Sequence, residues 1–177
     1  MKTLKLDNFT LYEYNDSKEH QEVIRQIEAT DPNNYLGSIK YLIQKINQRK
    51  VENPNNYFFI AYYQDEYPMG FISITYLDNQ YQISGGTLPQ FRKQNISSLL
   101  LEEFSERLLD YKKVSKLLEK YDTDNELHKE IYDQGLSDVE IDELVLKIDP
   151  SNVASHKVAE LIGYEQVDNT TFRRRKM

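Results

Sequence analysis

Hydrophobic and polar residues alternate along the start of the chain with two different periods. The segment 3–14 (TLKLDNFTLYEY) alternates every second residue, which is typical of a strand with one buried face. The segment 17–29 (SKEHQEVIRQIEA) instead has the period of an amphipathic helix, and either Asp16 or Ser17 could cap its start. The apolar side of this helix consists of Val23, Ile24 and Ile27.

A second amphipathic helix is predicted within 31–50, where apolar residues recur at helical spacing opposite Lys and Gln. Its apolar side consists of Leu36, Ile39, Ile43 and Ile46. After the breaker NPNN come three runs rich in β-branched and aromatic residues, at 57–63, 70–77 and 81–88. Turn signals separate them, so we expect an antiparallel meander.

The pattern returns to helical at Ser97 or Ser98 and stays so to about residue 112. A short strand is then predicted at 143–148 and a helix at 149–163, closed by Gly163. Two last strands follow, at 164–167 and 170–175. This order of elements predicts a mixed sheet with helices on both faces, and 177 residues fit a single domain.

The composition excludes several classes of protein. A hydrophobic fraction of 39%, with 14 tyrosines and 7 phenylalanines, is too high for a disordered chain even at a mean hydropathy of -0.72. The chain has no cysteine, which excludes disulfides and thiolate chemistry. A net charge of -7 argues against a nucleic-acid partner, and we interpret the basic run 173–176 (RRRK) as a solvated terminal strand or tail. No continuous apolar segment opens the chain, so we expect a cytoplasmic protein without a membrane anchor.

The stretch TLPQFRKQNISSLLLE, residues 87–102, places a basic, polar loop directly before a helix. The free N–H groups and the positive dipole end of a helix N-terminus suit a diphosphate. The loop has no glycine, but Asn95 tolerates a left-handed backbone better than most residues. Ser97 is small and can hydrogen-bond an oxygen, while Arg92 and Lys93 add positive charge. The loop is therefore compatible with phosphate binding by chemistry, although a plain solvated connection is the alternative.

Two segments of the chain together resemble the GCN5-related N-acetyltransferase (GNAT) superfamily. In the first, GGTLPQFRKQNISSLLLEEF, Arg92 falls at the first position of the family's pyrophosphate loop, and Asn95 and Ser97 fall where the family has glycines. Ile96 matches the usual aliphatic residue, and Ser98 matches a common hydroxyl position. The loop is thus a degenerate version of the family motif.

The second segment, ELVLKIDPSNVASHKVAELIGYEQV, resembles the family's strand five, helix four and strand six. Asn152 matches the asparagine that begins the helix, Ser155 a recurrent small or hydroxyl residue, and Gly163-Tyr164 the Gly-Phe or Gly-Tyr pair. This pattern is most similar to the branch that includes the ribosomal-protein N-terminal acetyltransferases. The resemblance spans essentially the whole chain.

The resemblance implies a GNAT-like α/β (α+β) fold, with a mixed, mostly antiparallel sheet of about seven strands flanked by helices. It implies one acetyltransferase domain over 1–177, with an acidic helical insertion at about 113–140 before strand five. Between Glu119 and Glu143 lie ten Asp or Glu and two Lys. This stretch is either a solvated helical hairpin or a source of negative electrostatic potential that attracts a cationic acceptor.

Acetyl-CoA is the cosubstrate that the resemblance implies. It would be held by the end of the strand before Pro89, by the loop 92–98 and by the start of the helix at 149–163. The backbone of the strand before Pro89 would bind the pantetheine arm, and a bulge at Gly85-Gly86 would splay this strand from 143–148. The expected cofactor-binding residues are Thr87, Leu88, Arg92, Lys93, Gln94, Asn95, Ile96, Ser97, Ser98 and Asn152. No metal site is expected, because no His, Asp or Glu pair has metal-ligand spacing.

The acid and base of the reaction are less defined by the sequence. Many family members have a tyrosine acid four residues before the Gly-Phe pair, where this chain has Ala159. Tyr164 and Ser155 are the candidate catalytic residues, with water as the alternative. His156 and His20 could act as bases, but single histidines on amphipathic helices are more often structural.

We therefore expect an N-acetyltransferase that transfers acetyl to a primary amine by direct attack in a ternary complex. The acceptor would be a small-molecule amine, a protein N-terminus or a lysine, and we expect it to be cationic. Dimers are common among similar proteins, so a homodimer is one option. The alternative is a catalytically weak or inactive GNAT-like domain that acts as a binding or regulatory module, which the missing glycines and the missing tyrosine favour.

Overall fold

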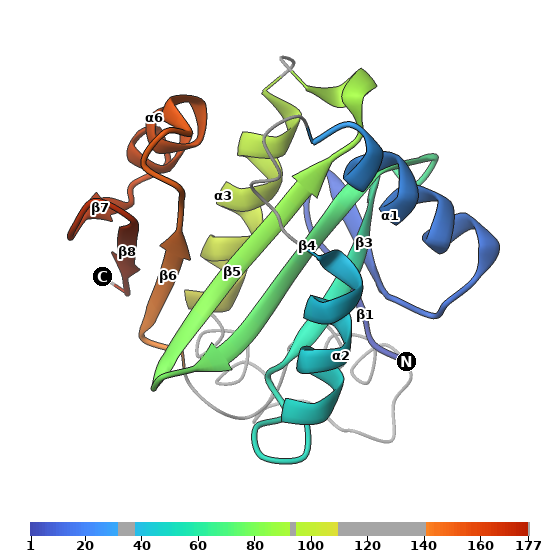
Figure 1. Ribbon diagram of the computed structural model, residues 1–177, viewed down its shortest axis with the longest axis horizontal. Helices are drawn as coiled ribbons and strands as arrows, with labels where there is room; N and C mark the ends of the chain where they lie inside the picture. Colours follow the sequence, from blue (N-terminus) through green and yellow to red (C-terminus); the bar gives the residue numbers. More distant parts are fainter. Residues whose placement is uncertain (32–37, 93–94, 110–140, 177) are drawn as a thin grey trace.

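The computed structural model describes residues 1–31, 38–92, 95–109 and 141–176, and their strands form one eight-stranded sheet (Figure 1). The strand order is β1-β2-β3-β4-β5-β6-β8-β7. Neighbouring strands are antiparallel except β5 and β6, which are parallel. The expected mixed, mostly antiparallel sheet is confirmed, with one strand more than the approximate number expected.

The additional strand arises at the N-terminus, where one strand was expected over 3–14. The chain instead forms a hairpin of β1 (Thr3–Lys5) and β2 (Phe9–Glu13), closed by a hydrogen bond from the Leu6 N–H to the Phe9 carbonyl. The hydrophobic alternation continues across Asp7-Asn8, and these two residues carry the turn.

The central meander consists of β3 (Tyr57–Tyr63), β4 (Tyr67–Leu77) and β5 (Gln80–Thr87), as the sequence predicted. Alternate residues of β3 point to opposite faces of the sheet. Phe59 and Ala61 pack in one hydrophobic core, and Phe58 and Ile60 in the other. The meander is therefore buried on both faces, which requires a layer of helices on each.

Helices α1 (Lys18–Ala29) and α2 (Ile39–Arg49) cover one face, and α3 (Ile96–Leu109) covers the other (Figure 1). Ser17, rather than Asp16, caps α1 by accepting a hydrogen bond from the His20 N–H. The apolar row on α3 consists of Leu100, Phe104 and Leu108, all buried. The two helical layers hold the central strands between them.

The C-terminal region adds β6 (Glu143–Lys147), α6 (Val153–Leu161), β7 (Glu165–Gln166) and β8 (Thr171–Arg175). The predicted acidic insertion at 113–140 lies outside the described residues. No helix within the described ranges is both long and apolar enough to cross a membrane.

The arginine run belongs to β8, which lies between β6 and β7 in the sheet. The expectation of a solvated strand or tail is therefore wrong for part of this run. The side chains of Arg173 and Arg174 are only 28% and 20% exposed, and they lie near Glu165 and Glu106, respectively. Arg175, at 63% exposure, remains on the surface and pairs with Glu143.

Candidate active site

The two parallel strands β5 and β6 pair over a short stretch and then separate (Figure 1). Their ladder runs from Tyr81 opposite Leu144 to Ile83 opposite Leu146. Beyond Ile83, β5 continues to Thr87 in register with β4, whereas β6 ends at Lys147. Within the described residues, no strand pairs with the β6-facing edge of β5 from Ser84 onward. This edge leaves backbone N–H and C=O groups available to an extended ligand.

The separation of the strands does not come from a bulge at Gly85-Gly86, as the sequence had suggested. The register of β5 against β4 is regular through both glycines, with Phe71 opposite Gly86 and Ile72 opposite Gly85. The pairing ends at Leu146, one residue before β6 itself ends, and the chain continues from β6 to α6. Glycines within a strand also mark places where two backbones approach closely, and Gly86 does lie directly against Gly70 of β4.

The connection from β5 to α3 presents a helix N-terminus. A single 3₁₀ turn at Pro89–Phe91 follows the buried Leu88, and Asn95 then has a φ of 59°, in the left-handed region. The Asn95 carbonyl accepts a hydrogen bond from the Leu99 N–H and so starts the helix. Asn95 therefore adopts the conformation that its place in a glycine position predicts.

The first turn of α3 differs in exposure from residue to residue. Ser97 is exposed, Ile96 is half-buried, and Ser98 is buried at 9% exposure. Their backbone N–H groups precede the first possible intrahelical partners, as at any helix start. The arrangement fits an anion at this N-terminus, with Ser97 the hydroxyl best placed to meet it. Lys93 and Gln94 lie outside the described residues.

Arg92 is engaged with the protein itself. Its Nε donates to the Thr87 carbonyl at 3.0 Å, and its two terminal nitrogens donate to the carbonyl and the Oγ1 of Thr30, both at 2.9 Å. The sequence suggested a phosphate ligand at this position. The geometry gives the side chain a bracing position between the end of β5 and the end of α1.

Asn152 and Ser155 form the cap of α6. The Asn152 Oδ1 accepts a hydrogen bond from the Ser155 N–H at 3.3 Å, so that Asn152 begins the helix as its resemblance to the family asparagine implied. Both residues are half-buried. His156, one turn along, contacts the Asp149 carbonyl with Nε2 at 3.0 Å and packs edge-on against Phe172, which is a structural environment.

Tyr164 lies in the core at 4% exposure, and its hydroxyl is 2.6 Å from the Ser105 Oγ of α3. Burial raises the pKa of Tyr164 to about 12, against the opposing effects of the Ser105 hydrogen bond and the Arg174 charge. Ala159, in the position of the family tyrosine, is fully buried. A proton donor to a leaving thiolate must touch it, and a hydroxyl held within the core on Ser105 is positioned for packing instead.

His20 is also buried, at 4% exposure, between the rings of Tyr14 and Tyr62. Its Nδ1 accepts a hydrogen bond from the Asn15 N–H at 3.3 Å. Burial lowers its pKa below the ordinary value, although the Glu19 charge opposes this shift. His20 therefore supports the attachment of α1 to the sheet.

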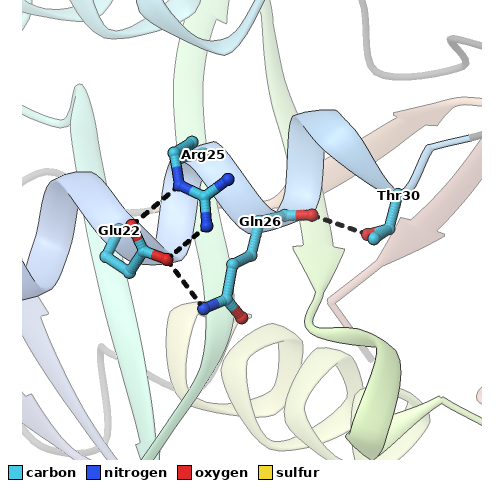
Figure 2. A network of polar contacts seen from close by, with 4 residues as sticks. All are labelled: Glu22, Arg25, Gln26 and Thr30. Carbon is cyan, nitrogen blue, oxygen red and sulfur yellow. Dashed lines mark hydrogen bonds and ion pairs between the residues drawn. The ribbon is translucent and has the colours of Figure 1, made fainter.

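A pocket that the sequence did not indicate lies between α1, the start of β4 and the β5–α3 connection, with a volume of about 350 Å³. Its lining consists of Glu19, Glu22, Val23, Gln26, Tyr67, Pro68, Leu88, Gln90 and Phe91. Figure 2 shows that Glu22 is already bound by Arg25 and Gln26 on the same helix. Among the described residues, no group of three or more His, Asp or Glu side chains could hold a metal ion.

No protein-family model matches this sequence, and the comparison with curated proteins finds no relative. Solved structures do match it. An acetyltransferase from Agrobacterium tumefaciens is similar with a TM-score of 0.68 at 11% identity, over 99% of this chain and 95% of that one. The ribosomal-protein-S5-alanine acetyltransferase from Vibrio fischeri has a TM-score of 0.62 at 7% identity, with 99% and 97% covered.

A third solved structure contains a ligand. It is RimL, a ribosomal L7/L12 α-N-protein acetyltransferase in complex with coenzyme A, with a TM-score of 0.61 at 14% identity over 98% of both chains. At these identities the likeness concerns the arrangement of the backbone. The chain has the mixed α/β fold of the GNAT acetyltransferases.

Proposed function

We propose that this protein is an acetyl-CoA-dependent N-acetyltransferase that acts on a primary amine. One observation carries the proposal. Among the described strands, none pairs with the β6-facing edge of β5 from Ser84 to Thr87, and β5 leads through the left-handed Asn95 into the N-terminus of α3. An extended arm and a diphosphate are the two parts of coenzyme A that such an edge and such a helix start can bind.

Two groups of residues would bind this cosubstrate, one its pantetheine arm and the other its diphosphate. The backbone of β5 up to Thr87 and Leu88 would hold the pantetheine arm by strand-like hydrogen bonds. The N–H groups of Ile96, Ser97 and Ser98 would hold the diphosphate, with the Ser97 hydroxyl as an added donor. Acetyl-CoA supplies the acetyl group in an activated form, as a thioester.

The transfer needs a neutral amine and a proton for the leaving group. A lysine-like amine has a pKa near 10.4, so a proton must leave before or during attack. The amine nitrogen forms a bond to the carbonyl carbon, the carbon–sulfur bond breaks, and the thiolate takes up a proton. Ser155, half-buried at the start of α6, remains our candidate donor, with water as the alternative. Tyr164 is withdrawn from this role because of its position in the core.

Protein N-termini are the first acceptors to test. Two structural neighbours are named as acetyltransferases of ribosomal proteins, and one of them is an α-N-protein acetyltransferase. Lysine side chains and small cationic amines come next, because the net charge of -7 favours a cationic acceptor.

Thermal unfolding with and without acetyl-CoA tests the proposal. At about 100 times its dissociation constant, a ligand of the folded state adds roughly 2.7 kcal/mol, which raises the melting temperature of a domain of this size by about 5–10 °C. Release of free thiol with a panel of peptides and amines then tests the transfer. Binding without thiol release would favour a regulatory module, and the absence of any shift would contradict coenzyme A binding altogether.

A further inference from the structure

Arg92 joins two elements that are far apart in the sequence. Within the described part of the chain, three of its five N–H donors bind, one to Thr87 at the end of β5 and two to Thr30 at the end of α1. Thr30 and Arg92 are 62 residues apart. The guanidinium fork thus fixes the distance between the end of α1 and the start of the β5–α3 connection.

The Thr30 end of this contact is itself well ordered by hydrogen bonds. Thr30 is the C-cap of α1, and its Oγ1 donates to the Gln26 carbonyl at 2.6 Å (Figure 2). The same oxygen accepts from Arg92. The Thr30 Oγ1 is therefore fixed by Gln26 on one side and by Arg92 on the other, so the Arg92 guanidinium has a single defined acceptor position there.

The charge of Arg92 also suits this place. The C-terminus of a helix carries a partial negative charge, which a nearby cation stabilises. The last turn of α1 has no basic residue of its own, and it contains Glu28. Arg92 supplies the missing cation from another part of the chain.

We infer that Arg92 is a positioning residue, which holds the β5–α3 connection against α1 so that the first turn of α3 is presented to the diphosphate. This inference rests on the proposed function for its ligand. The guanidinium acts through Thr30 and Thr87, and the backbone N–H groups of Ile96, Ser97 and Ser98, four to six residues later, meet the anion.

The prediction of a positioning role differs from that of a phosphate ligand in one respect. If Arg92 acts through Thr30, removal of the Thr30 hydroxyl should weaken acetyl-CoA binding about as much as a change at Arg92. Thr30→Val removes the hydroxyl at nearly constant volume, and Thr30→Ser retains it. Arg92→Lys retains the charge but loses the fork.

The experiment measures the dissociation constant of acetyl-CoA by calorimetry, well below the melting temperature of each variant. We expect Thr30→Val and Arg92→Lys each to weaken binding about tenfold, the double variant to be no weaker than either single one, and Thr30→Ser to match the wild type. Ser17→Ala is the matched control. It removes the cap at the other end of α1, so it should lower the unfolding midpoint and leave the affinity unchanged.

Wild-type affinity in Thr30→Val, together with a loss in Arg92→Lys, would overturn the inference and make Arg92 a phosphate ligand. An equal loss of affinity in Ser17→Ala would also overturn it, since general loosening of α1 would then suffice. If the wild type binds no acetyl-CoA, the proposed function fails by itself. Urea unfolding of the same five variants then decides whether Arg92 and Thr30 are coupled, and strict additivity of Thr30→Val and Arg92→Lys in the double variant would contradict the coupling.

Discussion

Gly70 of β4 lies so close to Gly86 of β5 that a Cβ atom at residue 70 would be 2.0 Å from the Gly86 carbonyl oxygen. No side chain can occupy this position without moving one strand away from the other. The contact lies in the part of β5 that pairs with β4 but with no other strand of the described ranges.

Replacement of Gly70 by alanine should therefore lower the free energy of unfolding by about 3 kcal/mol, because a backbone clash in a packed strand pair cannot be relieved by a rotamer change. Gly85→Ala is the matched control. Its Cβ would meet the Phe71 carbonyl oxygen at 3.3 Å, and we expect a change within about 1 kcal/mol. Urea denaturation measures both, and equal losses would show that the contact at Gly70 relaxes.

Substitutions at the hydrogen-bonded hydroxyls of Ser105 and Tyr164 distinguish a structural role of Tyr164 from a catalytic one. Tyr164→Phe should cost about 1–2 kcal/mol of stability, because the buried Ser105 hydroxyl loses its partner. The double variant Ser105→Ala/Tyr164→Phe should cost less than the sum of the single variants. Turnover with acetyl-CoA should be unchanged in Tyr164→Phe, and a drop in kcat at constant KM would return Tyr164 to the reaction.

His20 makes stability depend on pH on the acidic side. Burial lowers its folded pKa, while the unfolded chain titrates near 6.5. Below pH 6.5 the unfolded state therefore binds a proton that the folded state does not, and the free energy of unfolding falls as pH decreases until the folded pKa is passed. The neighbouring groups are Glu19, whose charge opposes the shift, and the rings of Tyr14 and Tyr62.

The variant His20→Asn retains an acceptor for the Asn15 N–H and removes the titration. Denaturation at a series of pH values should show a shallower loss of stability in His20→Asn than in the wild type between pH 6.5 and 5. Carboxylates titrate in both proteins, so the difference between the two curves isolates His20. Parallel curves would mean that His20 becomes charged within the fold.

Substitutions at Asn95 distinguish the contribution of its backbone conformation from that of its side chain. At a φ of 59°, Asn95→Ala should cost about 1 kcal/mol of stability, and Asn95→Gly should be nearly neutral. Asn95→Gly should also keep or tighten acetyl-CoA binding, since it restores the smaller residue at the helix start. Loss of binding in that variant, measured by calorimetry, would mean that the Asn95 side chain itself holds the phosphates.

Local signals predicted most of the fold. The strand at Tyr57–Tyr63 agrees to the residue, because its aromatic run is bounded by strong turn sequences on both sides. The left-handed Asn95 followed from residue type and place. The hairpin at Asp7-Asn8 was missed because hydrophobic alternation continues through it and hides the turn.

The side-chain partners could not be predicted in the same way. Arg92 was expected to bind phosphate because of its charge and its place at the first position of the family loop, whereas its contact with Thr30 depends on tertiary packing. Tyr164 was one of two candidate catalytic residues because Ala159 stands where the family has its tyrosine, and its contact with Ser105 on α3 lies in the core. Neither contact leaves a periodic or local trace in the sequence.

The β5–β6 junction joins the two antiparallel parts of the sheet through a short parallel pairing. Strands β1 to β5 form one continuous antiparallel run, and β6, β8 and β7 form another. Three residue pairs join them, whereas β4 and β5 share eight. Separation of β5 from β6 breaks few backbone hydrogen bonds. The free energy of opening measured by hydrogen exchange should therefore be lower for amides of β6 than for those of β4. A ligand that contacts both β5 and β6 would hold the two strands together. Slower amide exchange in Leu144–Leu146 would then report its binding before any product is formed.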